Sequence, residues 1–258
     1  MPTFSANLSM MYQEVDFIDR FGLAAADGFE YVEFLFPYTY PAQLIVDQLT
    51  THGLKLNLFN SPPGDFQAGE RGLAILPDRQ KEFDDGLALA VEYAQAMDCP
   101  QIHFMAGIKP EGVPFDELQD CYKKRLEQAA IACEPYNIDV LIEPINTISM
   151  PGYFLNYQNQ AINIIQELLL PNLKLMMDFF HAQMMEGNLE NLFIQNQAHI
   201  GHIQIAGPPH RHEPDHGEVN YQYLLPLIKS LGYQGLIGCE YKPLKGTSEG
   251  LKWLNYHR

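Results

Sequence analysis

Short apolar segments alternate with longer helical patterns along the whole of this chain, and this alternation is its most restrictive feature. The segments read as continuous apolar runs, which are typical of parallel strands covered on both faces. Eight strands are expected, at residues 3–9, 31–35, 54–60, 101–107, 140–145, 173–178, 200–206 and 236–241. Helical patterns follow them at residues 15–26, 42–52, 79–97, 115–134, 157–169, 189–197, 221–231 and 248–255.

One strand followed by one helix, eight times in succession, predicts an α/β fold of the (β/α)8 TIM-barrel type. Such a barrel occupies about 250 residues, so residues 1–258 are expected to form a single domain. Long loops rich in proline and glycine follow the third and seventh strands, at residues 61–77 and 206–220. Since loops after the strands build the active site in this fold, both are expected to border it.

Four polar residues stand at the carboxyl ends of otherwise apolar strands, one each on strands five to eight: Glu143, Asp178, Gln204 and Glu240. A carboxylate in apolar surroundings is costly unless it is paired, hydrogen-bonded or bound to a metal. Carboxylates converging at one rim would repel each other, and a divalent cation relieves that repulsion. This oxygen set favours Mg²⁺ or Mn²⁺ over Zn²⁺. The alternative is that each residue merely caps or braces its own strand.

Charge and composition exclude several classes of protein. With 32 acidic and 16 basic residues the formal charge is −16, so a nucleic-acid partner is not expected. No uncharged apolar run reaches the length of a membrane span, and residues 1–19 lack the pattern of a secretory signal. The four separated cysteines are expected to be reduced thiols of a cytoplasmic protein. The oligomeric state stays open, a homo-oligomer included.

Nine histidines are present, and five of them lie between His199 and His216. The run PPHRHEPDHGE within that interval reads as a loop without the spacing of a zinc site, so its histidines are expected to face solvent or substrate. His103, in strand four, and His181, three residues after Asp178, are candidates to donate hydrogen bonds at the barrel mouth, or else are buried supporting residues. Glycine-rich phosphate loops are absent from the sequence, so neither a nucleotide nor a flavin cofactor is expected.

Several stretches together resemble the hydroxypyruvate isomerase family of the xylose-isomerase-like barrels, whose near relatives include 2-oxotetronate isomerases. The matching stretches span nearly the whole chain and read FSANLSMM, VEFLFPY, LFNSPPGDFQAGERGLAILP, LIEPIN, DFFHAQ, HIQIAGPPHRHEPDHGEVNY and GLIGCEYKP. The resemblance implies a metal held by Glu143, Asp178, Gln204 and Glu240, with Glu143 and Glu240 also acting as the acid/base pair. It further implies that His181 and Arg211 contact substrate oxygens, with Glu213 and Lys242 as additional candidates.

The expected reaction is the interconversion of hydroxypyruvate and tartronate semialdehyde through an enediolate. A substrate carboxylate needs a cation, and the basic residues on loops of the active side are Arg211, Arg71 and Lys242. Gln204 stands where many ketose epimerases carry histidine, which favours the hydroxypyruvate isomerase branch. The alternatives are a 2-oxotetronate isomerase, a ketose epimerase or dehydratase of the same barrel, a DNA-repair endonuclease, and a sugar-acid-binding protein without catalysis.

Overall fold

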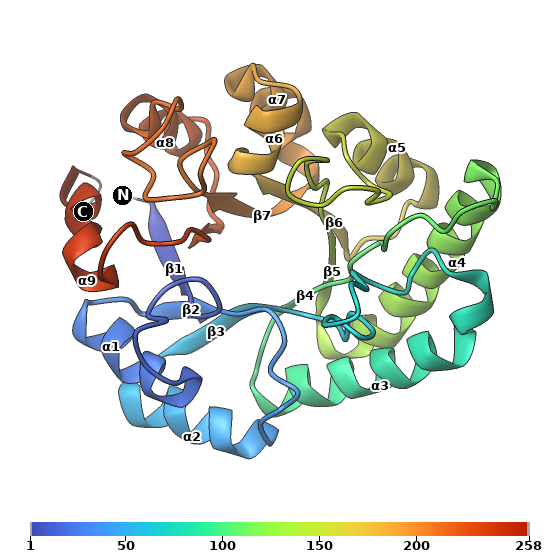
Figure 1. Cartoon of the computed structure of the whole chain (residues 1–258), viewed down its shortest axis with the longest axis horizontal. Coiled ribbons are helices and arrows are strands. Elements are labelled where there is room, and N and C mark those ends of the chain that lie inside the picture. Colours follow the sequence, from blue (N-terminus) through green and yellow to red (C-terminus); the bar gives the residue numbers. More distant parts are fainter. Residues whose placement is uncertain (1, 257–258) are drawn as a thin grey trace.

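The computed structural model describes residues 2–256, and eight parallel strands in these residues close into a barrel (Figure 1). Each strand pairs with the next along the chain, and the last pairs with the first. The strands are β1 (Thr3–Asn7), β2 (Tyr31–Glu33), β3 (Lys55–Asn60), β4 (Gln101–His103), β5 (Asp139–Ile142), β6 (Leu173–Asp178), β7 (Ile200–Ile205) and β8 (Leu236–Cys239). The predicted (β/α)8 fold and all eight predicted strands are therefore confirmed.

Helices surround the strands in chain order, as Figure 1 shows. The α-helices are α1 (Arg20–Ala26), α2 (Ala42–His52), α3 (Gln80–Ala96), α4 (Phe115–Cys133), α5 (Gln158–Leu168), α6 (Phe179–Met185), α7 (Leu189–Asn196), α8 (Tyr221–Ser230) and α9 (Thr247–Gly250). Short 3-10 helices are η1 (Phe17–Asp19), η2 (Pro77–Arg79), η3 (Glu134–Tyr136), η4 (Gln197–His199) and η5 (Leu251–Tyr256). Among the described residues, no helix combines the length and the apolar character that a bilayer span requires.

Several sequence-based predictions about these elements were wrong in detail. Strand six is followed by two helices rather than one, because α6 intervenes before the predicted helix. The Asp178 side chain accepts a hydrogen bond from the backbone N–H of Phe180 (2.7 Å) and so caps α6. Strand four ends at His103 rather than at residue 107, and Gly107 at the end of the predicted strand has φ +123°. The first and last predicted helices each comprise a 3-10 turn and an α-helical turn.

The apolar strands explain where the core lies. Residues of β4, β5 and β6 are almost entirely buried, because helices cover their outer faces while the barrel covers their inner ones. The chain closes on itself where Phe4 of β1 packs edge-on against Trp253 of η5, with ring centroids 5.3 Å apart.

Candidate active site at the carboxyl ends of the strands

A cavity of about 350 Å³ opens at the carboxyl ends of the strands. Most of its wall is apolar, and a few polar groups converge within it, as is usual for sites that bind small molecules. The polar and charged residues that line it are Asn60, Glu143, Ser149, His181, His210, Arg211, Glu240 and Lys242. The two long loops predicted to border the site contribute Phe66 from one, and Pro209, His210 and Arg211 from the other.

The four predicted metal ligands are held by adjacent strands. Asp178 ends β6 and lies beside Gln204 of β7 in the sheet register, while Glu143 and Glu240 directly follow β5 and β8. All four side chains are buried, with residue exposures between 0 and 6%. Parallel strands align their carboxyl ends at one rim, which is why residues far apart in sequence meet here.

The pKa values of the acidic groups at this rim are raised above their ordinary values. Burial, followed by the charges of Glu240 and Asp178, raises the pKa of Glu143 well above its usual value. Burial also raises the pKa of Glu240 to about 8, although Arg211 opposes the shift. The pKa of Asp178 is raised mainly by burial as well. Such shifts mark carboxyl groups that hold protons unless a cation is close.

Arg211 supplies one such cation. It lies in the loop after β7 with φ +60°, and its guanidinium donates to the Asp178 carboxylate (2.8 Å) and to the Glu240 carboxylate. Burial alone would lower the pKa of Arg211, but these two carboxylates raise it. The guanidinium is therefore committed to the carboxylates rather than directed only at the open cavity. It also lies over the Phe180 ring, 4.7 Å from its centroid.

His181 joins this cluster from α6. Arg211 Nη1 donates to His181 Nε2 at 2.8 Å, and the Asn146 side-chain amide lies 2.6 Å from Nδ1. Burial, followed by the charge of Arg211, lowers the pKa of His181 well below its usual value. An arginine can only donate, so Nε2 is the acceptor and the imidazole is neutral.

The donor set is suited to a divalent cation. Ligand atoms of Glu143, Asp178 and His181 lie within 4.8 Å of one another. This group contains two of the four predicted ligands, and its third member is His181, whose Nε2 accepts from Arg211. Two oxygens of the predicted set, Glu143 Oε1 and Gln204 Oε1, are buried and have no hydrogen-bond partner. Buried oxygens without partners are costly, and a hard cation is the partner that such oxygens accept.

The remaining predicted residues are distributed unevenly around the cavity. His103 Nδ1 lies 3.7 Å from Glu143 Oε2, and burial lowers the pKa of His103 to about 3. The exposed Lys242 lines the cavity. Glu213 and Arg71 do not line it. The Glu213 carboxylate accepts from the backbone N–H of Leu244 (3.1 and 3.2 Å), whereas Arg71 lies over the Phe66 ring and donates to two backbone carbonyls.

Sequence reasoning missed a polar group inside the barrel, beneath the rim. Its centre is Glu33, the last residue of β2, and it includes Ser5 and Asn7 of β1 and His202 of β7. Burial alone would raise the pKa of Glu33, but the adjacent His202 and the hydrogen bonds that Glu33 accepts lower it. A related signal, a polar residue within a predicted strand, was present at Asn7 and Glu33, but neither residue ended the strand that the sequence predicted.

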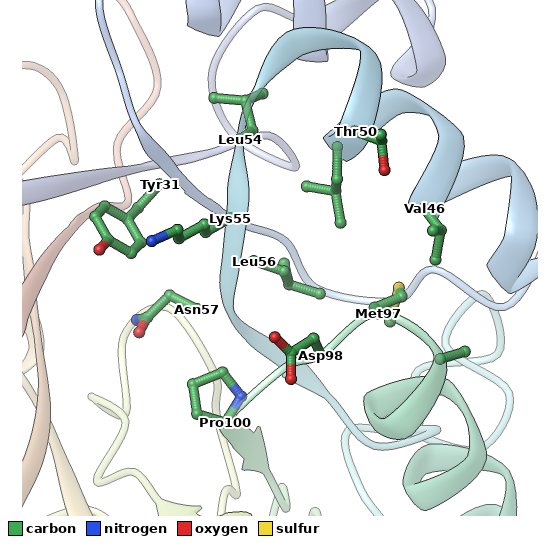
Figure 2. A pocket seen from close by; sticks show the side chains of 12 residues that line it. Tyr31, Val46, Thr50, Leu54, Lys55, Leu56, Asn57, Met97, Asp98 and Pro100 are labelled. Carbon is green, nitrogen blue, oxygen red and sulfur yellow. The ribbon is translucent and has the colours of Figure 1, made fainter.

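A second cavity, of about 470 Å³, lies at the opposite end of the barrel and contains none of the predicted site residues. Figure 2 shows it between α2 and the starts of β3 and β4, with the Lys55 amine directed towards the Tyr31 ring. No carboxylate cluster comparable to the rim lines this cavity. The larger cavity is therefore not the better candidate for an active site.

Comparisons with known proteins agree with this geometry. The family profile described as xylose isomerase-like TIM barrel matches residues 21–257. A 2-oxo-tetronate isomerase of Cupriavidus necator is 50% identical over 254 residues, 98% of each chain. The hydroxypyruvate isomerase of Escherichia coli is 43% identical over 258 residues, the full length of both chains. A crystal structure of an AP endonuclease of family 2 from Brucella melitensis superposes over the whole of both chains with a TM-score of 0.98 and 45% identity.

The resemblance that the sequence motifs suggested is thus confirmed over nearly the full length of the protein. The barrel, the cavity at its carboxyl rim and the buried acidic cluster are all consistent with that match. This chain belongs to the xylose isomerase-like TIM barrel family.

Proposed function

We propose that this protein is a metal-dependent isomerase that moves a carbonyl group between C2 and C3 of a short hydroxy-oxo acid. The observation that carries the proposal is the buried group of Glu143, Asp178 and Glu240, with unpartnered oxygens on Glu143 and Gln204. Glu143 and Glu240 of this group line the cavity. The isomerases that share 50% and 43% of its sequence support the same reaction class.

Two substrates fit this class. Hydroxypyruvate, the substrate favoured by the sequence motifs, has two hydrogens and a hydroxyl on C3, whereas a 2-oxotetronate carries a hydroxymethyl group in place of one hydrogen. The relative at 50% identity acts, by its name, on the four-carbon acid, so both acids are candidates of equal standing. A cavity of about 350 Å³ has room for either.

Glu143, Asp178, Gln204 and Glu240 are the residues that would hold a Mg²⁺ or Mn²⁺ ion. When bound, such an ion supplies Lewis-acid stabilisation of the negative charge that develops on the substrate oxygens. Glu143 and Glu240 are also the candidates for proton transfer, because both carboxyl groups line the cavity. Glu143 and Glu240 follow β5 and β8, and one would remove the proton from one carbon while the other returns a proton to the neighbouring carbon.

Substrate orientation falls to the neutral and cationic side chains of the cavity. Neutral His181 is held by Arg211 and Asn146, which fixes the direction of its ring. Lys242 and Arg211 both line the cavity and would neutralise the substrate carboxylate. His103, next to Glu143, is placed to support that carboxyl group. Apolar neighbours such as Phe180 and Met105 restrict the access of water to the reacting carbons.

The formal charge of −16 argues against DNA as a substrate, although a solved relative is described as an AP endonuclease. A sugar-acid-binding protein without turnover would retain the cavity and the ion but would not exchange substrate protons with solvent. A ketose epimerase would act on larger sugars, and solved epimerases with this fold are 16 to 18% identical to the chain, which supports the shared fold alone.

The decisive experiment measures turnover of hydroxypyruvate and 2-oxotetronate side by side, in D₂O, with chelator-stripped protein before and after addition of Mg²⁺ or Mn²⁺. We expect metal to restore turnover of one acid or both, with deuterium incorporated at the reacting carbon. The ratio of kcat/KM then identifies the preferred substrate. The proposal is wrong if, with metal restored, neither acid is converted and neither exchanges deuterium with the solvent. Binding of an acid without such exchange would indicate the non-catalytic alternative.

A further inference from the structure

Glu33 is the most completely hydrogen-bonded carboxylate in the barrel interior. Its Oε1 accepts from Asn7 Nδ2 (3.2 Å) and Gln204 Nε2 (2.8 Å). Its Oε2 accepts from Ser5 Oγ (2.7 Å) and lies 2.8 Å from His202 Nε2. Four neighbours therefore hold both oxygens of one side chain whose exposed fraction is 0%.

The backbone of β8 makes room for this carboxylate. A Cβ atom at Gly238 would lie 2.5 Å from each of the two Glu33 carboxylate oxygens, a distance that real side chains do not tolerate. The carboxylate thus occupies the space that any other residue at position 238 would fill. Its position is fixed by packing as well as by hydrogen bonds.

Gln204 is the first side chain that depends on this arrangement. A carboxylate can only accept hydrogen bonds, so the amide of Gln204 must present its nitrogen to Glu33. The amide oxygen then necessarily faces away from Glu33, and Oε1 is buried without a partner. Without the anion beneath it, the amide could rotate by half a turn and present N–H groups, which repel a cation.

Asn7 connects Glu33 to a second residue of the rim, Glu240. Its Nδ2 lies 3.2 Å from Glu33 Oε1 and 3.3 Å from Glu240 Oε1, while its Oδ1 accepts from the backbone N–H of Ser9 (3.0 Å). The Asn7 amide is therefore also fixed in one orientation. Two of the four proposed metal ligands are linked to one carboxylate.

We propose that Glu33 is a positioning residue for the metal site: it turns the Gln204 amide so that Oε1 faces the cation, and it steadies Glu240 through Asn7. This inference rests on the proposed function, since it assigns Gln204 and Glu240 to the ion. Glu33 itself does not line the cavity. Residues that orient metal ligands are typically worth 10- to 100-fold in metal affinity.

The test is the affinity of chelator-stripped protein for Mn²⁺, measured by the EPR signal of the free ion, in wild type, Glu33→Gln, Glu33→Asp and Ser5→Ala. Glu33→Asp keeps the negative charge but is too short to reach Gln204, so it separates position from charge. Ser5→Ala is the matched control, because it removes a hydrogen bond from Oε2 and leaves the contact between Oε1 and Gln204 in place.

We expect both Glu33 variants to bind Mn²⁺ about 10- to 100-fold more weakly and Ser5→Ala to stay within about threefold of wild type. The EPR spectrum of the bound ion should also change in the Glu33 variants, which a defect in stability alone would not produce. Circular dichroism and thermal unfolding of each stripped protein serve as folding controls.

Three results would overturn the proposal. Glu33→Asp that binds like wild type would mean that charge alone matters, and wild-type affinity in both variants would remove Glu33 from the site. Failure of both variants to fold would assign Glu33 to the stability of the barrel. A wild-type protein that does not bind Mn²⁺ would instead reject the metal site, and with it the proposed function, before the role of Glu33 is reached.

Discussion

Glu33 and Glu143 are both buried glutamates at the carboxyl ends of strands, yet they differ in how their carboxyl groups are hydrogen-bonded and in the direction of their pKa shifts. Inside the barrel, Glu33 accepts hydrogen bonds on both oxygens, and its pKa is lowered because His202 and these bonds outweigh burial. At the rim, Glu143 Oε1 has no partner, and burial together with neighbouring carboxylates raises the pKa.

The difference shows that burial does not by itself decide what a carboxyl group does. Desolvation disfavours the charge of both residues, and only the donors around Glu33 offset that cost. A carboxylate whose oxygens all accept hydrogen bonds cannot accept a further ligand, whereas a carboxyl group with an unpartnered oxygen can. The interior carboxylate is thus fully hydrogen-bonded, whereas the rim carboxyl group keeps an oxygen that can accept a ligand.

The largest expected effect comes from replacing Glu143, to which the proposed function assigns acid/base chemistry. Glu143→Gln should lower kcat on the preferred acid by about 100-fold or more, because an acid/base pair contributes at least that much. The fold should stay intact, since a neutral amide relieves repulsion from Asp178 and Glu240. Steady-state kinetics with saturating Mg²⁺, and thermal unfolding, provide the measurements.

Glu167→Gln is a matched control, because Glu167 is a largely exposed glutamate that pairs with Lys123 far from the cavity. It should leave kcat unchanged. If Glu143→Gln keeps more than about a tenth of the activity, Glu143 has no acid/base role. The difference in hydrogen bonding between Glu33 and Glu143 would then not correspond to a difference in function.

A smaller effect is expected from Gly238→Ala, which attacks the interior region without altering any charge. The new Cβ would lie 2.5 Å from both Glu33 oxygens and must displace them. Overpacking of this kind typically costs about 1–3 kcal/mol in the free energy of unfolding. Urea denaturation measures that loss, and Mn²⁺ titration should show weaker binding in parallel.

Gly86→Ala is the corresponding control. Gly86 lies within α3, where an added Cβ would meet only Pro62 at an ordinary 3.5 Å. Alanine favours a helix over glycine, so this variant should gain about 0.5–1 kcal/mol. Equal destabilisation by both substitutions would show that the space over Gly238 has no special role.

The last prediction concerns pH: the free energy of unfolding should change only slightly with each pH unit. The pKa of Glu240 is raised from 4.5 to about 8 on folding, so between these values the folded metal-free protein binds more protons than the unfolded chain. Its free energy of unfolding should therefore fall as pH rises from 5 to 8, by at most about 1.4 kcal/mol per pH unit for each such group. Glu33 has the opposite sign, because its lowered pKa contributes stability that is lost only below about pH 4.5.

Urea denaturation at pH 5, 6, 7 and 8 measures this slope. Saturating Mg²⁺ should flatten or reverse it, because the ion binds the deprotonated carboxylates. The prediction fails if stripped wild-type protein becomes more stable over this interval, which would indicate that Arg211 already holds the rim carboxyls ionised.

Much of the fold followed from local pattern. Helix α2 begins and ends where the sequence predicted, since Gly53 adopts the left-handed conformation (φ +64°) that stops a helix. The short helix α6 was not predicted, because the sequence pattern assigned no element between strand six, which ended at Asp178, and the helix expected from residue 189. Its start depends on the side chain of Asp178, whose capping role is visible only once the strand has ended.

Part of the candidate site also followed from local pattern, and part of it did not. Polar residues at the ends of strands five to eight predicted the rim, because a parallel barrel brings the carboxyl ends of its strands together whatever the sequence between them. The same reasoning did not predict where Glu213 and Arg71 lie, since loops fold through contacts that no periodic pattern records.

The sequence by itself determined the eight strands, their order and the acidic rim, since these depend on local periodicity and on one topological rule. Only the tertiary structure decided that Arg211 pairs with Asp178 and Glu240 and that Glu33 supports Gln204 from across the barrel. Hydrogen bonds between residues 171 positions apart depend on register and on the space left over Gly238. These are properties of the closed barrel and not of any segment within it.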